Sequence, residues 1–147
     1  MNPKVTLESL NDRSKGHLTD FLGLEALELE PTRTRSRMEI TPKHLSPTGY
    51  LHAAAIIAMA DTTCGWGTYA NLPEDSQGFT TLELKSNFLG TLQHGLLYCE
   101  AVAEHIGRST QIWSATVTDA SGKRIALFRC SQIILYPSCG NLNLLVD

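Results

Sequence analysis

Several features that mark specialised classes of protein are missing from this sequence. None of the four cysteines stands in a Cys-x-x-Cys pair, and the five histidines are scattered without metal-ligand spacing, so no metal site is expected. No apolar run approaches the roughly 20 residues that a transmembrane helix needs. A P-loop and the glycine set of a dinucleotide-binding fold are also absent. The sequence therefore indicates a protein without a cofactor, in which a bound nucleotide would lie on an open surface.

A strong charge of one sign is also missing. The formal net charge is -3 and the sequence pI is about 5.9, whereas nucleic acids and anionic membranes are normally met by a strongly basic surface. No secretory signal with a charged start and an apolar middle opens the chain. We therefore expect a cytoplasmic protein that binds neither nucleic acid nor membrane. A small anionic ligand needs only a local basic patch, so the low net charge does not exclude it.

The length of 147 residues predicts one domain over residues 1–147, with residues 1–16 and 137–147 peripheral. The first 15 residues are polar and indicate a short surface helix or a frayed terminus, with no chemistry assigned. Hydrophobic periodicity then predicts six strands and one long helix. The predicted elements are a helical turn at 17–22, two strands within 24–40 separated by Pro31, a helix from 51–53 to about 70, and strands at 80–89, 96–106, 110–119 and 124–136.

An antiparallel sheet around a single buried helix is the simplest packing of this order, which makes the fold class α+β. The helix is apolar on all sides and one sheet covers only part of it, which favours a dimer. Arg33, Arg35 and Arg37 share one face of their strand, and a solvated face is expected, with a subunit or phosphate contact as the alternative. Cys64, Cys99 and Cys130 are expected in the core as reduced thiols, and Cys139 exposed in the tail.

The predicted helix carries the main functional signal. Ala53 to Ala60 are eight apolar residues in a row, and Asp61 follows them directly. A carboxylate in such surroundings is costly to desolvate unless it is paired. Gly65 and Gly67 weaken the second half of the helix by about 1 kcal/mol each relative to alanine. We expect them to allow close packing against a strand or a ligand.

Four segments of this chain together resemble the hotdog-fold acyl-CoA thioesterases of the PaaI-like group, which includes the phenylacetate-pathway and hydroxybenzoyl-CoA thioesterases. The segments are GYLHAAAIIAMADTTCGWG, FTTLELKSNFLGTL, EHIGRSTQIWSATVTDASGK and IALFRCSQIIL. The resemblance spans about Leu24 to Tyr136. The family pattern at the helix is a Gly, two residues, His-Gly-Gly, and an apolar run that ends in an acid. Here the pattern reads Gly49, His52-Ala53-Ala54 and Met59-Ala60-Asp61.

The resemblance implies the hotdog fold and a site for thioester hydrolysis. The backbone N–H of Ala53, at the positive end of the helix dipole, would stabilise the oxyanion. Asp61 would come from the opposing subunit, as general base or as nucleophile, with a pKa raised by burial. His52 would orient the loop and the thioester. Ser46 would hold the lytic water or the carbonyl, with a helix-entry cap as the equal alternative.

The resemblance also implies a set of residues that contact the substrate. Gly49, Ala54, Gly65 and Asn87 are expected near the acyl-CoA, and Arg108, Ser109 and Thr110 near the CoA nucleotide, where an arginine can pair with phosphate. A plain hairpin turn with an exposed arginine is the alternative for the last group. His44 is expected in a surface loop. The expected assembly is a homodimer of hotdog subunits or a tetramer.

Three departures from the family pattern bear on activity. Ala53 and Ala54 replace two glycines, so that a methyl group narrows the approach to the oxyanion donor. Ser46 stands where the family often has Asn or Gln, and Phe88-Leu89-Gly90-Thr91 replaces a Phe-x-Arg-Pro. The alternatives to hydrolysis are therefore a CoA-ester-binding protein without turnover and a hotdog enoyl-thioester hydratase or dehydratase.

Overall fold

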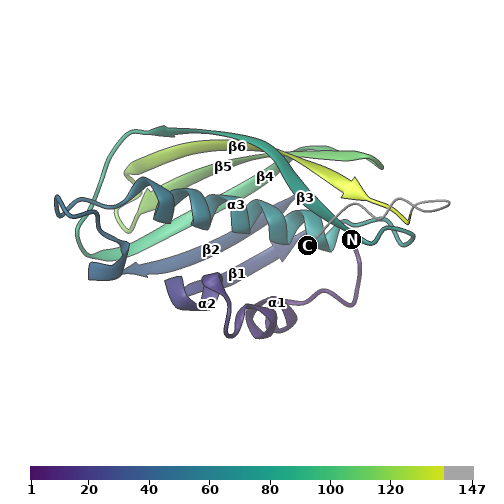
Figure 1. The fold of residues 1–147 in the computed structure, drawn as a ribbon, viewed down its shortest axis with the longest axis horizontal. Coiled ribbons are helices and arrows are strands. Elements are labelled where there is room, and N and C mark those ends of the chain that lie inside the picture. Colours follow the sequence, from purple (N-terminus) through teal and green to yellow (C-terminus); the bar gives the residue numbers. More distant parts are fainter. Residues whose placement is uncertain (138–147) are drawn as a thin grey trace, which may run out of the picture.

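The computed structural model of the protein describes residues 1–137 (Figure 1). Its elements follow the predicted order closely. They are α1 (Leu7–Ser14), α2 (Leu18–Leu22), β1 (Leu24–Glu30), β2 (Arg33–Ile40), a 3-10 turn at Pro42–His44, α3 (Ala53–Ala70), β3 (Gly78–Phe88), β4 (Gly95–Ile106), β5 (Thr110–Asp119) and β6 (Arg124–Leu135).

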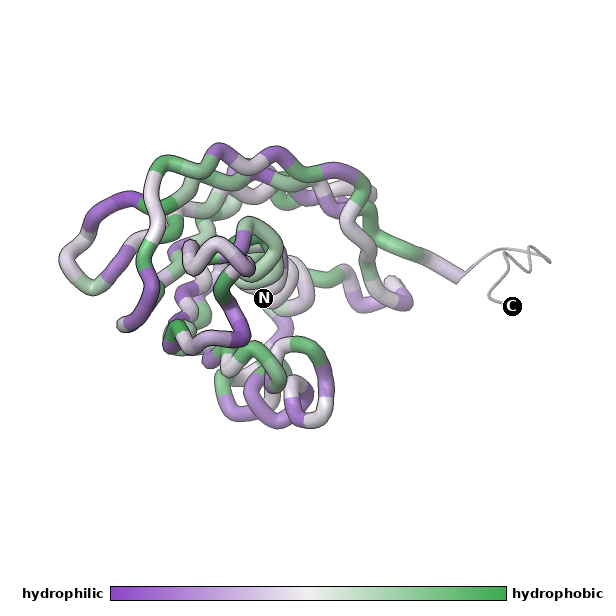
Figure 2. The backbone as a smooth tube through the Cα atoms, turned by 60° about the vertical axis from the view of Figure 1, so that its left-hand side comes forward, coloured by the Kyte–Doolittle hydropathy of each residue, from purple (hydrophilic) through white to green (hydrophobic). Residues whose placement is uncertain are grey.

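The six strands form one antiparallel sheet in the order β1-β2-β4-β5-β6-β3. The sheet curves around α3, which lies along its concave side (Figures 1 and 2). The strand that follows the helix, β3, is at the opposite edge of the sheet from β1 and β2. The predicted α+β architecture, an antiparallel sheet wrapped around one long helix, is confirmed.

Helix α3 is held on the sheet by close packing and by one short polar contact, which a hydrogen bond within the helix supports. A Cβ atom added to Gly67 would come within 2.4 Å of the indole ring of Trp113 on β5, so only glycine lets the helix approach this strand. The Thr63 hydroxyl donates to the Met59 carbonyl at 2.7 Å and accepts from the Ser36 hydroxyl at 2.7 Å. Both polar side chains are fully buried, and these bonds offset the cost of burying them.

The first 15 residues contain the helix α1 and are not a frayed terminus, which decides between the two alternatives that the sequence leaves open. Thr6 and Ser9 form a reciprocal capping box at the start of α1, which satisfies backbone donors that the helix leaves free. Asn11 bonds both backbone groups of Ala26, accepting from its N–H at 2.9 Å and donating to its carbonyl at 3.3 Å. Ala26 lies at a β-bulge of β1. Asn11 thereby fixes α1 against the sheet at one defined position.

The two edges of the sheet differ in character. The Arg33, Arg35 and Arg37 row on β2 pairs with glutamates, including Arg35 with Glu28 at 2.8 Å and Arg37 with Glu25 at 2.7 Å. It is a solvated, ion-paired face, as expected. On the other edge, β3 exposes three large apolar side chains, namely Leu82, Leu84 and Phe88. An exposed apolar edge strand is a template for pairing with another chain.

Three of the four cysteines lie where the sequence predicts. Cys64, Cys99 and Cys130 are buried free thiols. Burial raises the pKa of Cys99 to about 12 and raises the pKa of Cys64 as well, so both thiols are neutral core residues. Cys139 lies outside the described residues. Across residues 1–137, no helix is long and apolar enough to cross a membrane.

Candidate active site

Asp61 lies in the middle of α3, on a side of the helix that faces β3 and the cavity, and is half-buried. The Thr81 hydroxyl of β3 donates to Asp61 Oδ1 at 3.1 Å. Burial raises the pKa of the Asp61 carboxyl above its usual value, while hydrogen bonds with Thr81 and Gln132 act in the opposite direction. The raised pKa expected from the sequence is confirmed, and it suits a base that works near neutral pH.

A short polar network connects Asp61 to the core. Thr81 also lies 2.9 Å from Gln132 Oε1, and Gln132 Nε2 donates to Cys130 Sγ at 3.3 Å. A hydroxyl has one proton, so Thr81 donates either to the carboxylate or to the amide oxygen. Gln132 is fully buried, and its amide is held between Thr81 and Cys130. The network places the Asp61 carboxyl beside Thr81, at the wall of the sheet.

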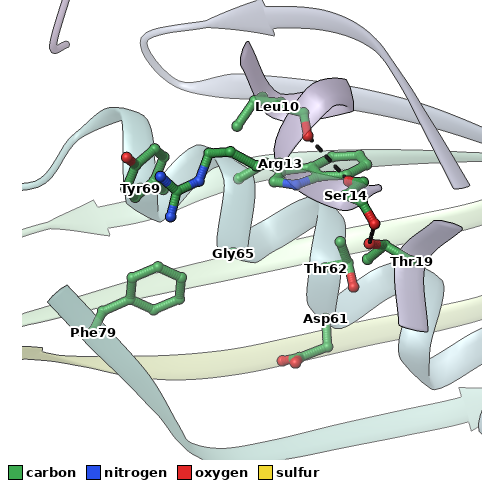
Figure 3. A pocket seen from close by; sticks show the side chains of 10 residues that line it. Leu10, Arg13, Ser14, Thr19, Asp61, Thr62, Gly65, Tyr69 and Phe79 are labelled. Atoms are coloured by element: carbon green, nitrogen blue, oxygen red, sulfur yellow. Dashed lines mark hydrogen bonds between the residues drawn. The ribbon is translucent and has the colours of Figure 1, made fainter. Parts of the chain in front are cut away.

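A cavity of about 300 Å³ opens beside Asp61. It lies between α3, the two N-terminal helices and the start of β3 (Figure 3). Its lining residues are Leu10, Arg13, Ser14, Thr19, Asp61, Thr62, Gly65, Trp66, Tyr69 and Phe79. Most of this surface is apolar or aromatic, with one acid and one base. Such a composition is typical of a pocket for a small organic group.

Gly65 lies one helical turn after Asp61 and forms part of the cavity wall. A Cβ atom at this position would be 3.4 Å from the Phe79 ring, which is an ordinary contact. Packing within the subunit therefore does not require glycine here. The missing side chain leaves room between the acid and the aromatic rings, and a contact between Gly65 and a ligand stays a prediction.

The start of α3 presents free hydrogen-bond donors to solvent. His52 is the N-cap, and its Nδ1 accepts from the Ala54 N–H at 3.0 Å. Within residues 1–137 no partner is found for the Ala53 N–H or for His52 Nε2. His52, Ala53 and Ala54 are all exposed. A carbonyl oxygen brought to this helix end would meet an unpaired N–H and the positive end of the helix dipole.

The loop before α3 contains two of the predicted site residues, Ser46 and Gly49. Gly49 has a positive φ of 82°, which favours glycine, and its N–H donates to the Ser46 carbonyl at 2.9 Å. The Ser46 hydroxyl bonds the Thr48 hydroxyl at 2.6 Å. Ser46 is not the helix cap, because His52 fills that position. Ser46 and Gly49 thus shape the turn that leads the chain to His52.

The expectation of a surface position for His44 is wrong. His44 is buried, with 1% of its surface exposed, because both ring nitrogens have backbone partners. Nδ1 accepts from the Thr41 N–H at 3.0 Å, and Nε2 lies 2.8 Å from the Leu22 carbonyl. His44 therefore joins the end of α2 to the turn before the α3 loop and is a structural residue.

The β4–β5 turn holds Arg108, Ser109 and Thr110 away from Asp61. Arg108 Nη1 lies 3.1 Å from an Asp75 oxygen, and its guanidinium stacks on the Tyr136 ring at 4.7 Å. The Ser109 and Thr110 carbonyls accept backbone bonds. Arg108 and Asp75 are exposed, and such surface pairs contribute little to stability. The arginine is thus held in place yet free to exchange partners.

Asn87 and Thr81 lie on opposite faces of β3. Their partners on β6 are Leu127 and Gln132, which are an odd number of residues apart and therefore point to opposite faces of the sheet. Asn87 lines a separate hollow with Glu83, Lys85 and Arg129. His52 and Asp61 are nine residues apart on α3, which corresponds to about 13 Å along the helix. Within one subunit, therefore, the structure brings Asp61 and Gly65 together, but it separates them from His52, Ala53 and Ala54 and from Asn87.

Several residues of the cavity and of the polar network beside Asp61 have no sequence signal. Thr81 and Gln132 look like ordinary strand residues, and Trp66, Tyr69 and Phe79 look like core residues. Arg13 belongs to a segment to which no chemistry is assigned. The one available clue is the spacing of Asp61, Gly65 and Tyr69 at four residues, which places them on one side of a helix. No cluster of three or more potential metal ligands occurs in residues 1–137.

Comparison with known proteins agrees with this picture. The family described as the Thioesterase superfamily matches residues 48–126. A 1,4-dihydroxy-2-naphthoyl-CoA hydrolase from Listeria monocytogenes is 32% identical over 114 residues, covering 78% of this chain and 92% of that protein. A mutant thioesterase from Pseudomonas aeruginosa has the same fold, with a TM-score of 0.86 at 24% identity, covering 91% of this chain and 96% of that chain.

Two structures of one Staphylococcus aureus protein are also similar, at 25% identity. Their TM-scores are 0.79 and 0.77, and both cover 82% of this chain, with 100% and 98% of the other chain covered. One carries a glutamate-to-alanine substitution and the other a glutamine-to-alanine substitution.

Proposed function

The chain belongs to the thioesterase superfamily and has its hotdog fold, and on that premise we propose that it hydrolyses an acyl-CoA or aryl-CoA thioester to the free acid and CoA. The observation that carries the proposal is Asp61, a half-buried carboxylate on the wall of an apolar cavity with a pKa raised by burial. A core helix would avoid such a charge unless it is used.

Asp61 acts on the thioester carbonyl either directly or through water. As a general base it takes a proton from a water molecule that attacks the carbonyl carbon. As a nucleophile it forms an anhydride that water then hydrolyses. In both routes the carboxylate must be ionised and must face the carbonyl. Thr81 supports this orientation, because its hydroxyl donates to Oδ1 and leaves Oδ2 for the reaction.

The start of α3 supplies the oxyanion site. The tetrahedral intermediate carries a negative charge on the former carbonyl oxygen, and the free N–H of Ala53 at the helix end is suited to stabilise it. His52 caps the helix through Nδ1, which leaves Nε2 to donate toward the thioester. Ser46 holds the lytic water or the carbonyl.

A spacing in one relative supports the assignment of Asp61 and Ser46. The substituted glutamine and glutamate in the two Staphylococcus aureus structures lie fifteen positions apart. Ser46 and Asp61 are separated by the same number of positions in this chain.

The site is completed by a second subunit. About 12 Å of helix separates Ala53 from Asp61, which is too far for both to act on one carbonyl within a subunit. The exposed apolar side chains of β3 provide a surface for an isologous contact with a second copy. In the resulting homodimer, Asp61 of one subunit faces the α3 start of its partner. A tetramer of two such dimers is the larger assembly we propose.

Arg108, Ser109 and Thr110 are proposed to hold the CoA nucleotide at the β4–β5 turn. Arg108 would exchange its exposed Asp75 partner for a phosphate, which offers a stronger charge-assisted bond. Gly49, Ala54, Gly65 and Asn87 remain the proposed contacts to the rest of the substrate.

A thiol-release screen with aromatic, short-chain and long-chain CoA esters tests the function. We expect hydrolysis of at least one class, and a loss of about a hundredfold or more in Asp61→Asn and Asp61→Ala while the fold persists. CoA binding without thiol release from any ester would identify a binding protein instead. Hydration of a 2-enoyl thioester without hydrolysis would identify a hydratase.

A further inference from the structure

The cavity beside Asp61 carries a second charge, and we propose that Arg13 selects an aromatic acyl group that bears a carboxylate on the side away from the thioester. The proposal rests on the proposed function, since it takes the thioester to lie at Asp61. It concerns which substrate the cavity accepts rather than how the bond is broken.

Arg13 is a cation without an anion of its own. The arginines of β2 pair with glutamates, and Arg108 pairs with Asp75. Arg13 forms no ion pair within residues 1–137, and its guanidinium stacks on the Tyr69 ring at 4.8 Å. Stacking orients the planar group and leaves its N–H donors at the edge. Figure 3 shows Arg13 reaching from α1 to Tyr69, apart from Asp61.

The position of Arg13 is set by the anchoring of α1. Asn11, two residues earlier, bonds both backbone groups of Ala26, and Leu10 is buried, with 2% of its surface exposed. Because α1 is capped at its start and fixed to the sheet on one side, its other side faces α3 across the cavity. Arg13 is exposed and thus lies at the rim of the cavity, on a helix whose position is fixed.

The space between the two charges suits a ring. Asp61 and Tyr69 are eight residues apart on α3, about 12 Å along the helix, and Gly65 between them has no side chain. The walls at this point are the aromatic rings of Trp66 and Phe79. A volume of about 300 Å³ is at the small end of ligand pockets. It fits a single aromatic ring better than a long acyl chain.

The charges set the orientation of the acyl group. A thioester carbonyl is neutral and can approach Asp61, whereas a second carboxylate would be repelled by Asp61 and attracted by Arg13. A planar guanidinium binds a carboxylate through two parallel hydrogen bonds. The ring therefore lies with its thioester toward Asp61 and its carboxylate toward Arg13.

This selectivity belongs to the part of the chain outside the family match. The matched residues are 48–126, and α1 precedes them. Asp61 and Gly65 are inside the match, while Arg13, Leu10 and Asn11 are not. The reaction and the choice of acyl group are thus assigned to different segments of the chain.

Two isosteric substrates test the proposal. Terephthaloyl-CoA carries a carboxylate opposite the thioester, and 4-carbamoylbenzoyl-CoA replaces it with a neutral amide of the same shape. We expect the wild-type protein to prefer the carboxylate in kcat/KM by about ten- to a hundredfold, mainly through KM. Arg13→Met should abolish the preference, and Arg13→Lys should keep part of it. Arg124→Met, at an exposed arginine with no ion pair in the described part of the chain, should keep all of it.

The second measurement does not depend on turnover. Calorimetry compares the binding of 4-carbamoylbenzoate, whose neutral amide stands in for the thioester and whose carboxylate can reach Arg13, with the binding of the uncharged terephthalamide, to wild type and Arg13→Met. A carboxylate preference that Arg13→Met removes supports the proposal, even if no ester is hydrolysed and the proposed function fails. Hydrolysis of both esters at equal kcat/KM, or a preference that survives in Arg13→Met, overturns the proposal and leaves thioester hydrolysis standing. Absence of any binding preference overturns it as well.

Discussion

The two glycines of α3 lie two residues apart and face opposite environments. Gly67 touches the sheet, where an added Cβ would be 2.4 Å from Trp113, while Gly65 faces the cavity, where an added Cβ would meet Phe79 at 3.4 Å. The first glycine is required by packing and the second is not. One side of the helix is therefore a closed core surface, and the other is an open surface that holds Asp61. Substitutions on the two sides should separate stability from activity.

The largest expected effect is on the open side, in Asp61→Asn. We expect thiol release to fall by about a hundredfold or more, because the amide can neither take a proton nor attack. The stability of the folded variant at neutral pH should instead be higher than that of wild type. The pKa of Asp61 is higher in the folded protein than in the unfolded chain. Its contribution to the free energy of unfolding is therefore fully present below the unfolded pKa near 3.8, and it is lost as pH rises through the folded pKa.

Thermal unfolding of both proteins across pH checks this prediction. At neutral pH, Asp61→Asn should unfold at a higher temperature than wild type, and the difference should shrink at acidic pH. An active Asp61→Asn, or one that is less stable at neutral pH, would contradict the assignment of Asp61 as a costly functional group.

The next effect is on the closed side, in Gly67→Ala. The added methyl would overlap the Trp113 ring, which is fully buried and cannot move aside. Overpacking of this kind costs about 1 to 3 kcal/mol, partly offset by the better helix propensity of alanine. Urea unfolding should give a lower midpoint, with kcat unchanged in the protein that remains folded.

A smaller effect is expected where the cavity meets the sheet, in Thr81→Val. The variant removes a hydrogen bond that lowers the pKa of Asp61, so the acid limb of the kcat/KM profile should move to higher pH. Thr81→Ser keeps the hydroxyl and should keep the wild-type limb. A shift of the limb toward lower pH in Thr81→Val would show that the hydroxyl does not stabilise the ionised acid.

The smallest effect is expected in Gly65→Ala, the open-side counterpart of Gly67→Ala. The methyl reaches only an ordinary contact with Phe79, so stability should rise by up to about 1 kcal/mol through helix propensity. The same methyl narrows the cavity. Hydrolysis of ring-bearing esters should fall severalfold relative to acetyl-CoA, as measured by kcat/KM. A destabilised Gly65→Ala would remove the contrast between the two glycines.

The sequence predicts the parts of this molecule that depend on local pattern. The period-two strands, the boundaries of α3, the helical turn at 17–22 and the burial of Cys64, Cys99 and Cys130 agree with the structure, because periodicity and turn chemistry decide them. Asp61 stands out for the same reason, as a charge at the end of an apolar run.

Features that depend on contacts between distant segments could not be predicted. The position of α1, and with it Arg13, follows from Asn11 reaching a β-bulge at Ala26. His44 is buried because Leu22 offers it a carbonyl across the fold. Thr81 and Gln132 meet only because β3 crosses to the far edge of the sheet and pairs with β6. None of these contacts leaves a periodic signal in the sequence.

The central claim, that Asp61 of one subunit works with the α3 start of its partner, can be measured by mixing two inactive variants. Ala53→Pro removes the proposed oxyanion donor and is compatible with the helix, because proline is tolerated at the first helical position. Each homodimer should be inactive. A refolded equal mixture with Asp61→Asn should recover about a quarter of wild-type thiol release, since half of the dimers carry one intact site of two. Mixed dimers without activity would contradict the shared site.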